Sequence, residues 1–388
     1  MKKLSKDFKL VLVLFFVWRV ATLFVSYLAT VVIPKWGGWF PYPDRVLIPT
    51  GLPSWIWGFG NFDGVHYLRI AQDGYVAANS QAFFPLYPLL VRFLNIFPKN
   101  ALLDTSLFVD PSYFFTGFIL SNILFIAALY FFYKLIRIDY GKRTGLLSLI
   151  LLLVFPTSYY FGSVYTESLF LLLAASSIFY IRKRNFILGG VLAGLASATR
   201  VLGLMLFPLL IIEIFRAGKV ERIKALAGAI LAPLGATIYM LYLKGTTGDF
   251  LYFLTAQPGF GAERSAKPFI LLPQVIYRYF KIFLALPVTS MKFFNAGLEF
   301  VFALAPLILL IVFWKKMRFS YWIFTLGALI LPTLTGTFSS MPRYVLMGFL
   351  LFPHIVQKLG KYFIPVSILL ALLGVILVSL FTRGYWVA

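Results

Sequence analysis

The chain has 388 residues, of which 61% are hydrophobic and only 12% charged, with a mean hydropathy of +0.90. Soluble domains are about 45–50% apolar and about 25% charged, so this composition excludes a water-soluble fold, and its hydrophobicity also excludes disorder. Zero Cys and two His exclude a disulfide scaffold and a Cys/His zinc site. We therefore predict an all-α polytopic membrane protein, whose net charge of +22 reflects basic cytoplasmic loops rather than nucleic-acid binding.

The apolar runs are long enough to cross a hydrocarbon core of ~30 Å. The first run, 8–33, has four lysines at or before its start and is too long for a signal peptide, so it predicts an uncleaved span with a cytoplasmic N-terminus. More than half of the 35 Lys and Arg residues fall in six groups, and placing all six in the cytoplasm gives a consistent alternation. About eleven spans result, with the C-terminus outside, and we treat residues 1–388 as one domain. The predicted spans are 8–33, 112–133, 145–161, 167–181, 186–200, 202–215, 225–243, 296–313, 319–336, 344–357 and 362–382.

Three segments need separate treatment. The stretch 186–215 is apolar, has basic flanks on both sides and contains Arg200, so it predicts a helical hairpin with Arg200 near its outer tip. Residues 34–111 form a long outer loop. Residues 244–295 form a second outer segment, which we consider a candidate for gating the substrate. Its apolar part, 269–290, predicts a re-entrant or interfacial pair in preference to a hairpin that would raise the count to thirteen spans.

Within the first outer loop, residues 61–74 have the period of a helix. At ~100° per residue, Asp63, His66, Arg69 and Asp73 share one side, whereas the intervening apolar residues lie away from it. This pattern predicts a short amphipathic helix in the outer interface, stopped by Gly74. A solvated face with an internal salt bridge is the simpler interpretation, and a set of groups that bind or react with a substrate is the functional one.

Several motifs then resemble those of the PIG-V-like membrane mannosyltransferases, which belong to the GT-C superfamily. The first is Phe-Asp-Gly-Val-His-Tyr-Leu-Arg-Ile-Ala at 62–71, although the family typically has Trp where this chain has Phe. It is followed by Ala-Phe-Phe-Pro-Leu-Tyr-Pro-Leu at 82–89. Tyr-Thr-Glu at 165–167, Ala-Thr-Arg-Val-Leu-Gly at 198–203 and Pro-Arg-Tyr at 342–344 complete an ordered set. The predicted topology places all of them on one side of the membrane.

The resemblance implies a GT-C-like helical bundle that transfers a hexose, with mannose expected, from a polyprenyl-phosphate sugar to an acceptor hydroxyl at the outer face, with inversion. Asp63 is then the candidate general base, and His66 the group that orients it or binds the phosphate or a sugar hydroxyl. Arg69, Asp73 and Glu167 are candidate substrate-binding residues, with ion pairing as the alternative for Glu167. Arg19 in the first span also has a counterpart in many members.

Arginines are suited to the lipid phosphate because the guanidinium stays ionised and offers two parallel donors. Arg200 and Arg343 are the candidates, with a salt bridge to Glu167 or Asp63 as the alternative. Arg264 and Lys267 lie in a Gly-rich stretch and are expected to close over the phosphate. Besides the donor lipid and membrane lipids, the expected partner is a glycan, glycolipid or protein acceptor, with no nucleic acid.

No cofactor is expected. Asp63 lacks an acid two residues away on either side, so the sequence favours catalysis without a metal over a bound divalent ion. A transporter or flippase of lipid-linked sugars is the rival class, and a non-catalytic subunit with the same fold is the other alternative. The compact chain without Asn-x-Ser/Thr sequons favours a prokaryotic plasma membrane.

Overall fold

A computed structural model describes residues 5–38, 43–100, 103–261, 264–265 and 270–387, and the regular structure within them is helical throughout. Side-chain caps fix several helix starts: the Ser5 hydroxyl accepts from the N–H of Phe8 at 3.2 Å, and Asp110 caps the helix that begins at Pro111. Contacts group the chain into two compact units. The boundary between them falls after residue 175, inside the helix Glu167–Arg182. The predicted single domain stays a prediction.

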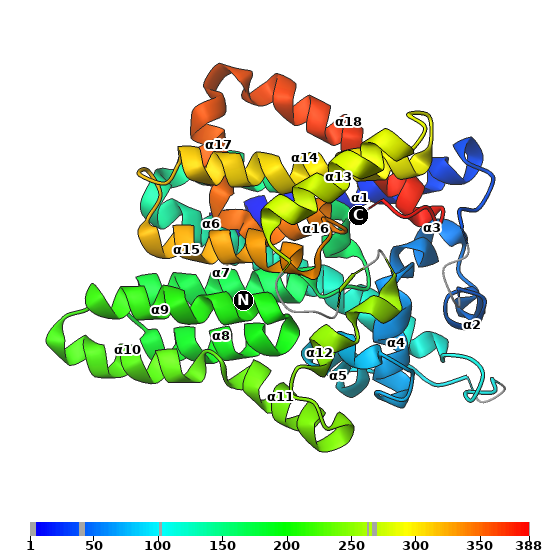
Figure 1. Cartoon of the computed structure of the whole chain (residues 1–388), viewed down its shortest axis with the longest axis horizontal. Coiled ribbons are helices and arrows are strands. Elements are labelled where there is room, and N and C mark those ends of the chain that lie inside the picture. Colours follow the sequence, from blue (N-terminus) through cyan, green and yellow to red (C-terminus); the bar gives the residue numbers. More distant parts are fainter. Residues whose placement is uncertain (1–4, 39–42, 101–102, 262–263, 266–269, 388) are drawn as a thin grey trace. The chain divides into compact units, whose positions relative to one another are not determined.

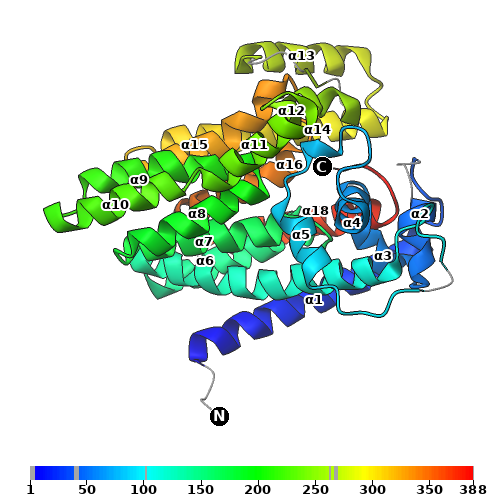
Figure 2. The ribbon, with the colours of Figure 1, turned by 90° about the horizontal axis from the view of Figure 1, so that it is seen from below.

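Unit 1 comprises residues 1–76, 85–175 and 359–387. Its longest helices pack side by side, α1 against α6 and α18, as the ribbon in Figure 2 shows for α1 and α6. Val17 and Val20 on α1 remain 64% exposed, as expected for a surface that faces lipid. Its helices are α1 (Lys6–Val32), α2 (Pro43–Val46), α3 (Ser54–Trp57), α4 (Asp63–Asp73), α5 (Leu86–Phe93), α6 (Pro111–Val154), the start of α7 (Glu167–Arg182) and α18 (Phe363–Thr382), with 3₁₀ turns at Ile48–Thr50, Gly58–Gly60, Ser158–Gly162 and Gly360–Tyr362.

Helix α6 is a hairpin rather than one rod. Gly141 has φ +79°, and a Cβ placed on Gly145 would lie 3.2 Å from the ring of Tyr133. In a straight helix these two residues would be ~18 Å apart along the axis, so the chain turns back at Gly141. The two predicted spans 112–133 and 145–161 are confirmed as separate helices, although the second ends at Val154 before a proline.

Unit 2 comprises residues 77–84 and 176–358. In Figure 1, α8, α9, α10 and α15 run side by side, and small residues allow this approach: a Cβ on Gly190 would lie 2.2 Å from the carbonyl oxygen of Gly228. Its helices are the rest of α7, α8 (Phe186–Thr199), α9 (Leu206–Phe215), α10 (Lys219–Leu231), α11 (Leu234–Thr247), α12 (Tyr252–Thr255), α13 (Leu272–Ala285), α14 (Met291–Val312), α15 (Phe319–Ile330), α16 (Met341–Tyr344) and α17 (Phe352–Leu359), with 3₁₀ turns at Ser80–Ala82, Val201–Met205, Gln257–Phe260, Leu331–Thr335 and Val345–Leu351.

The hairpin predicted for 186–215 is confirmed. Helix α8 ends at Thr199, Arg200 is extended (φ −156°, ψ 147°), and a Cβ on Gly203 would lie 2.4 Å from the backbone of Ala196. In contrast, the apolar part of the second outer segment forms a single helix, α13, of 14 residues. A single helix is neither the predicted re-entrant or interfacial pair nor the hairpin that would give thirteen spans, so both interpretations of 269–290 are wrong for its described part.

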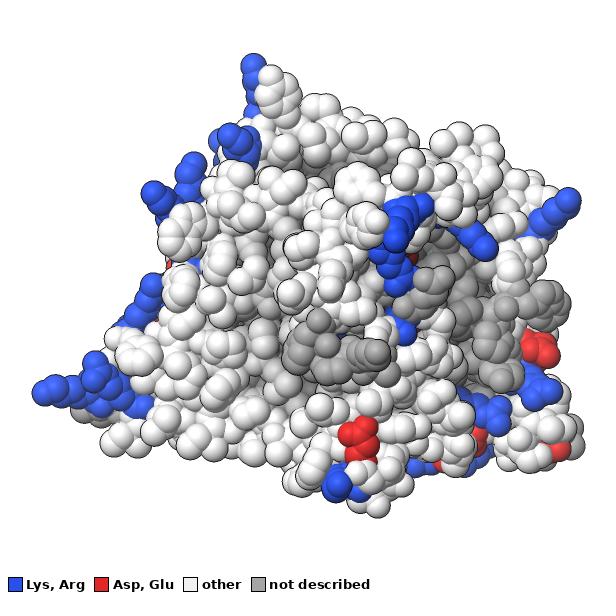
Figure 3. Space-filling view, viewed as in Figure 1, with Lys and Arg blue, Asp and Glu red and all other residues white. Residues whose placement is uncertain are grey.

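Some of the basic groups that the sequence predicts to be cytoplasmic lie close to one another within a unit. In unit 1 the Asp7 carboxylate lies 2.5 Å from Arg137 and 3.8 Å from Lys134. In unit 2, Figure 3 shows basic side chains where α9 leads into α10 and α14 into α15, and others over α13. Five helical stretches of the described residues are long and apolar enough to cross a membrane, and three further apolar helices are shorter. The chain is an integral membrane protein, and the count of eleven spans stays a prediction.

Candidate active site

Helix α4 forms as the sequence pattern predicts. Gly74 ends it with φ +81°, a conformation that favours glycine. Val65, Leu68 and Ala71 are buried, at 3%, 0% and 1% exposure. The four polar residues of the predicted edge are half-buried. The polar edge therefore exists and faces away from the packed side of the helix.

The start of α4 is fixed by the Tyr-Thr-Glu motif. The Tyr165 hydroxyl donates to the carbonyl oxygen of Asn61 at 2.7 Å and accepts from the N–H of Asp63 at 3.2 Å. The N–H of Val164 donates to Phe59 O at 3.0 Å, and a Cβ on Gly64 would lie 3.3 Å from Val164 O. Two motifs about a hundred residues apart in the sequence thus form one structure around Asp63.

Glu167, at the first position of α7, is completely buried. It interacts electrostatically with Tyr87, whose hydroxyl contacts Ser121 at 2.8 Å and donates to Gly117 O at 3.1 Å. The ring of Tyr67 on α4 packs edge-on against Tyr87 at 5.4 Å. The packed side of α4 and the carboxylate of Glu167 are therefore connected through Tyr87.

The polar edge has two parts that differ in their partners. At the end of α4, Arg69 Nε lies 2.9 Å from Asp73, whose carboxylate also accepts from Gln72 at 3.0 Å, so the simpler interpretation of an internal salt bridge holds for this pair. At the start of α4, burial lowers the pKa of His66 below its ordinary 6.5, and the charge of Asp63 opposes that shift. A neutral imidazole next to a carboxylate at pH 7 is suited to hydrogen bonding and proton transfer.

Arg19 supports this region from α1. Its side chain is 7% exposed, its Nη2 donates to Gly162 O at 3.0 Å, and its guanidinium lies 4.5 Å from the ring centre of Phe59 and 4.7 Å from that of Phe118. A buried cation in a span is costly unless aromatic faces and carbonyls surround it. Arg19 therefore holds the turn before the Tyr-Thr-Glu motif against the turn before α4.

Unit 2 brings two of the predicted arginines together. Arg200, at the tip of the α8–α9 hairpin, and Arg343, on α16, lie 5.1 and 5.6 Å from the ring centre of Tyr344. Arg343 is 5% exposed. Both guanidinium groups thus contact one aromatic ring, which limits their orientations.

A second polar cluster lies nearby on α13 and α14. The Tyr279 hydroxyl donates to the Glu299 carboxylate at 2.5 Å, and burial together with this carboxylate raises the pKa of Tyr279. Arg264 Nη1 donates to Gln257 at 3.3 Å and interacts electrostatically with Glu299, as does Arg278. The sequence does not indicate Glu299 and Tyr279 as a pair, because only the fold brings α13 and α14 together. Lys267 lies outside the described residues.

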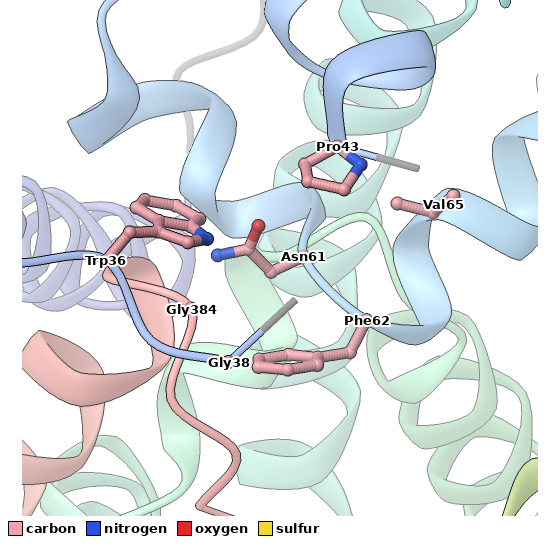
Figure 4. Close-up of a pocket in the computed structure, with 7 residues that line it drawn as sticks. All are labelled: Trp36, Gly38, Pro43, Asn61, Phe62, Val65 and Gly384. Carbon is pink, nitrogen blue, oxygen red and sulfur yellow. The ribbon is translucent and has the colours of Figure 1, made fainter. Parts of the chain in front are cut away.

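A shallow pocket opens beside the start of α4 (Figure 4). Its seven lining residues include Trp36, Asn61, Phe62 and Val65, and the rings of Trp36 and Phe62 border it from two sides. Within the described ranges, no three His, Asp or Glu side chains are placed to hold a metal ion together.

These features define a polytopic all-α membrane protein with a polar site on a short helix outside its long spans. The family model described as mannosyltransferase (PIG-V) matches residues 9–332, and the chain belongs to this family.

The relatives that match in sequence are longer proteins. Over 167 residues the chain is 27% identical to GPI mannosyltransferase 2 of Drosophila pseudoobscura pseudoobscura. This aligned stretch covers 42% of this chain and 35% of the relative. Over 196 residues the chain is 27% identical to GPI alpha-1,6-mannosyltransferase 2 of Mus musculus, and this stretch covers 48% of this chain and 38% of the relative. The matched stretch is thus little more than a third of each relative's length.

Among solved structures, the oligosaccharyltransferase of Archaeoglobus fulgidus aligns with a TM-score of 0.44 and 14% identity, over 94% of this chain and 53% of that one. A second structure of the archaeal enzyme, with an inhibitory peptide and a dolichol-phosphate, gives a TM-score of 0.41 and 12% identity. Overlap at this level is too low to transfer chemistry between the proteins.

Proposed function

We propose that the chain is a membrane glycosyltransferase that moves a hexose, with mannose expected, from a polyprenyl-phosphate sugar to the hydroxyl of a glycan, glycolipid or protein acceptor. The observation that carries this proposal is the start of α4, where Asp63 and His66 stand on a polar edge fixed by Tyr165 in a member of the mannosyltransferase family. The Arg69–Asp73 pair at the other end of α4 orders the same edge.

The reaction is one displacement with inversion. The acceptor oxygen forms a bond to C1 of the hexose while the bond between C1 and the phosphate oxygen breaks. Asp63 takes the acceptor proton, and the polyprenyl phosphate leaves with the bonding electrons. His66 orients the Asp63 carboxylate, since the two side chains interact electrostatically one turn apart on α4.

Arg200 and Arg343 are proposed to bind the phosphate of the donor. Their guanidinium planes are held by the ring of Tyr344, and Arg offers paired donors to phosphate oxygens. Charge accumulates on that phosphate as the C1–O bond breaks, so donors fixed in advance stabilise the transition state more than the ground state. Arg264, beside Glu299, is proposed as a further contact to the same phosphate.

The decisive assay uses the purified full chain in lipid nanodiscs, a polyprenyl-phosphate carrying radiolabelled mannose, and a membrane lipid extract as the acceptor. We expect Asp63→Asn to lower transfer by about 10²–10⁴-fold, because general-base catalysis contributes that much. The matched control is Asp104→Asn, which removes the same charge from an exposed carboxylate of the same loop and should stay within about threefold of wild type.

Each result has a meaning. Equal transfer by both variants would remove Asp63 as the base. A wild-type chain that binds the donor but forms no product would favour a non-catalytic subunit. Movement of the donor between leaflets without transfer would favour a flippase.

The proposed location of the site at the outer face can be tested separately. Because the chain has no Cys, a single introduced cysteine shows on which side of the membrane its position lies. Ala78 and Lys142 are both exposed, one beside the site motifs and one in a basic group. In intact cells a membrane-impermeant maleimide should label Ala78→Cys and not Lys142→Cys. The reverse pattern would place the site at the cytoplasmic face.

A further inference from the structure

The residue before Asp63 has an unusual backbone. Phe62 has φ +60° and ψ −119°, a strained region that bulky side chains avoid. Its side chain is nevertheless only 3% exposed. Because the torsions of Phe62 set the direction in which α4 begins, they also set the direction of the Asp63 side chain. Such a conformation persists only when surrounding contacts hold it.

Those contacts come from the end of the chain. The ring of Phe62 lies 5.5 Å from that of Phe381 and 5.0 Å, edge-on, from that of Trp386. The Asn61 side-chain amide donates to Phe381 O at 2.9 Å and to Thr382 O at 3.4 Å, across 320 positions of sequence. A Cβ on Gly58 would lie 2.6 Å from Thr382 O, so this approach also depends on a glycine.

The end segment is itself anchored, by Arg383. Its guanidinium donates to Ile33 O and Pro34 O at 2.8 Å each and to Ser54 at 3.3 Å, and it lies 5.0 Å from the ring centre of Trp36. The carbonyl of Arg383 accepts from the N–H of Gly37 at 2.9 Å. Residues 381–386 therefore contact two parts of the chain: residues 33–37, where the first loop begins, and residues 61–62, just before α4.

We propose that residues 381–386, here called the C-terminal brace, position Asp63 by holding Phe62 in its strained conformation. The brace lies beyond the stretch 9–332 that matches the family model, so the motifs alone do not specify it. None of its residues is assigned contact with substrate, and its effect on transfer rests on the function proposed above. Phe381, Arg383 and Trp386 are thus positioning residues.

The test compares two half-buried tryptophans of unit 1, each of which makes an edge-on ring contact. Trp386 contacts Phe62 at 5.0 Å, whereas Trp55 contacts Tyr27 on α1 at 6.1 Å. In the full chain, Trp386→Ala should lower kcat for mannosyl transfer by about tenfold or more with KM for the donor within about twofold, because small displacements of a reacting group cost rate rather than affinity. Trp386→Phe should restore most of the rate, and Trp55→Ala should leave kcat within about twofold.

A second readout does not depend on activity. Hydrogen exchange of the peptide covering residues 61–70 should speed up by about tenfold in Trp386→Ala and stay unchanged in Trp55→Ala. If Trp386→Ala does not fold, Arg383→Lys, which keeps the charge but loses the fork of donors, replaces it and should accelerate the same peptide.

The two proposals fail separately. If wild type shows no transfer with any donor, the exchange result still decides the brace, and only the proposed function is lost. If wild type is active and Trp386→Ala changes neither kcat nor exchange in residues 61–70, the brace is wrong. Equal acceleration in the two tryptophan variants would also overturn it, since the effect would then be general loosening of unit 1.

Discussion

Arginines at the two ends of the α8–α9 hairpin differ in what their guanidinium groups contact. At the end of α9, Arg318 donates to both oxygens of Glu213, at 2.7 and 2.5 Å, and Ser320 donates to the same carboxylate at 2.5 Å. At the hairpin tip, Arg200 and Arg343 contact the face of Tyr344. In the first arrangement the donors of Arg318 bind a carboxylate, whereas in the second the guanidinium groups lie over an aromatic ring. The first arrangement is therefore expected to matter for stability, whereas the second involves the two arginines proposed to bind the donor phosphate.

The largest effect is expected for Glu213→Gln, which tests the contact between Arg318 and Glu213 at the end of α9. Glu213 is 3% exposed, and removing its charge leaves the partly buried Arg318 without its bidentate partner, which should cost about 3–5 kcal/mol of unfolding free energy. Thermal unfolding in detergent measures this loss. The control Glu221→Gln breaks an exposed pair with Arg184 at 3.5 Å and should cost no more than about 1 kcal/mol. Equal losses would mean that the contact between Arg318 and Glu213 does not stabilise the end of α9.

At the hairpin tip, Arg343→Lys should affect rate rather than stability. Lys keeps the charge but loses the planar fork and its stacking on Tyr344, so we expect kcat/KM for the donor to fall by about 10–100-fold, or about 1.4–2.8 kcal/mol. The melting temperature should stay within a few degrees of wild type. Arg200→Lys should behave alike, and the combined variant should lose less than the sum if both bind one phosphate. Wild-type rates in both would end the phosphate assignment.

The elements that the sequence predicted best are those set by local patterns. The period of residues 63–73 predicted both α4 and its buried side, and Gly74 predicted its end. The basic flanks of 186–215 predicted the hairpin because one helix would have placed a basic flank on the outer side. These signals depend on neighbours in sequence, which is why a single chain suffices to find them.

What the sequence could not predict depends on distant contacts. Nothing near Phe62 indicates its positive φ, because that torsion is held by rings more than 300 positions away. The Glu299–Tyr279 contact likewise needs α13 to pack against α14, and an isolated acid in an apolar run gives no partner. The internal salt bridge on α4 was predicted because its partners are neighbours in sequence, whereas the partner of Glu299 could not be.

The same contrast exists on α4, on a smaller scale. Asp73 is paired with Arg69 as a half-exposed i, i+4 pair, for which about 0.2–0.5 kcal/mol is typical. Asp73→Asn should therefore lower stability by no more than about 0.5 kcal/mol and keep transfer within about threefold, as measured by unfolding and by the mannose assay. A loss of transfer beyond tenfold at unchanged stability would instead show that Asp73 contacts the substrate, as the sequence analysis expected.

The smallest effect on stability at neutral pH is expected for His66, because its titration affects stability only in acid. Burial lowers the pKa of His66 in the folded chain below the 6.5 of the unfolded chain, although Asp63 opposes the shift. Above pH 6.5 the imidazole is neutral in both states, so its contribution is complete. As the pH falls through 6.5 towards the lowered value, the unfolded chain binds the proton first, and stability is lost. His66→Gln should match wild type near pH 7.5 and lose less melting temperature between pH 7 and 5. A steeper loss in the variant would mean that Asp63 outweighs burial and that the imidazolium is the stabilised form.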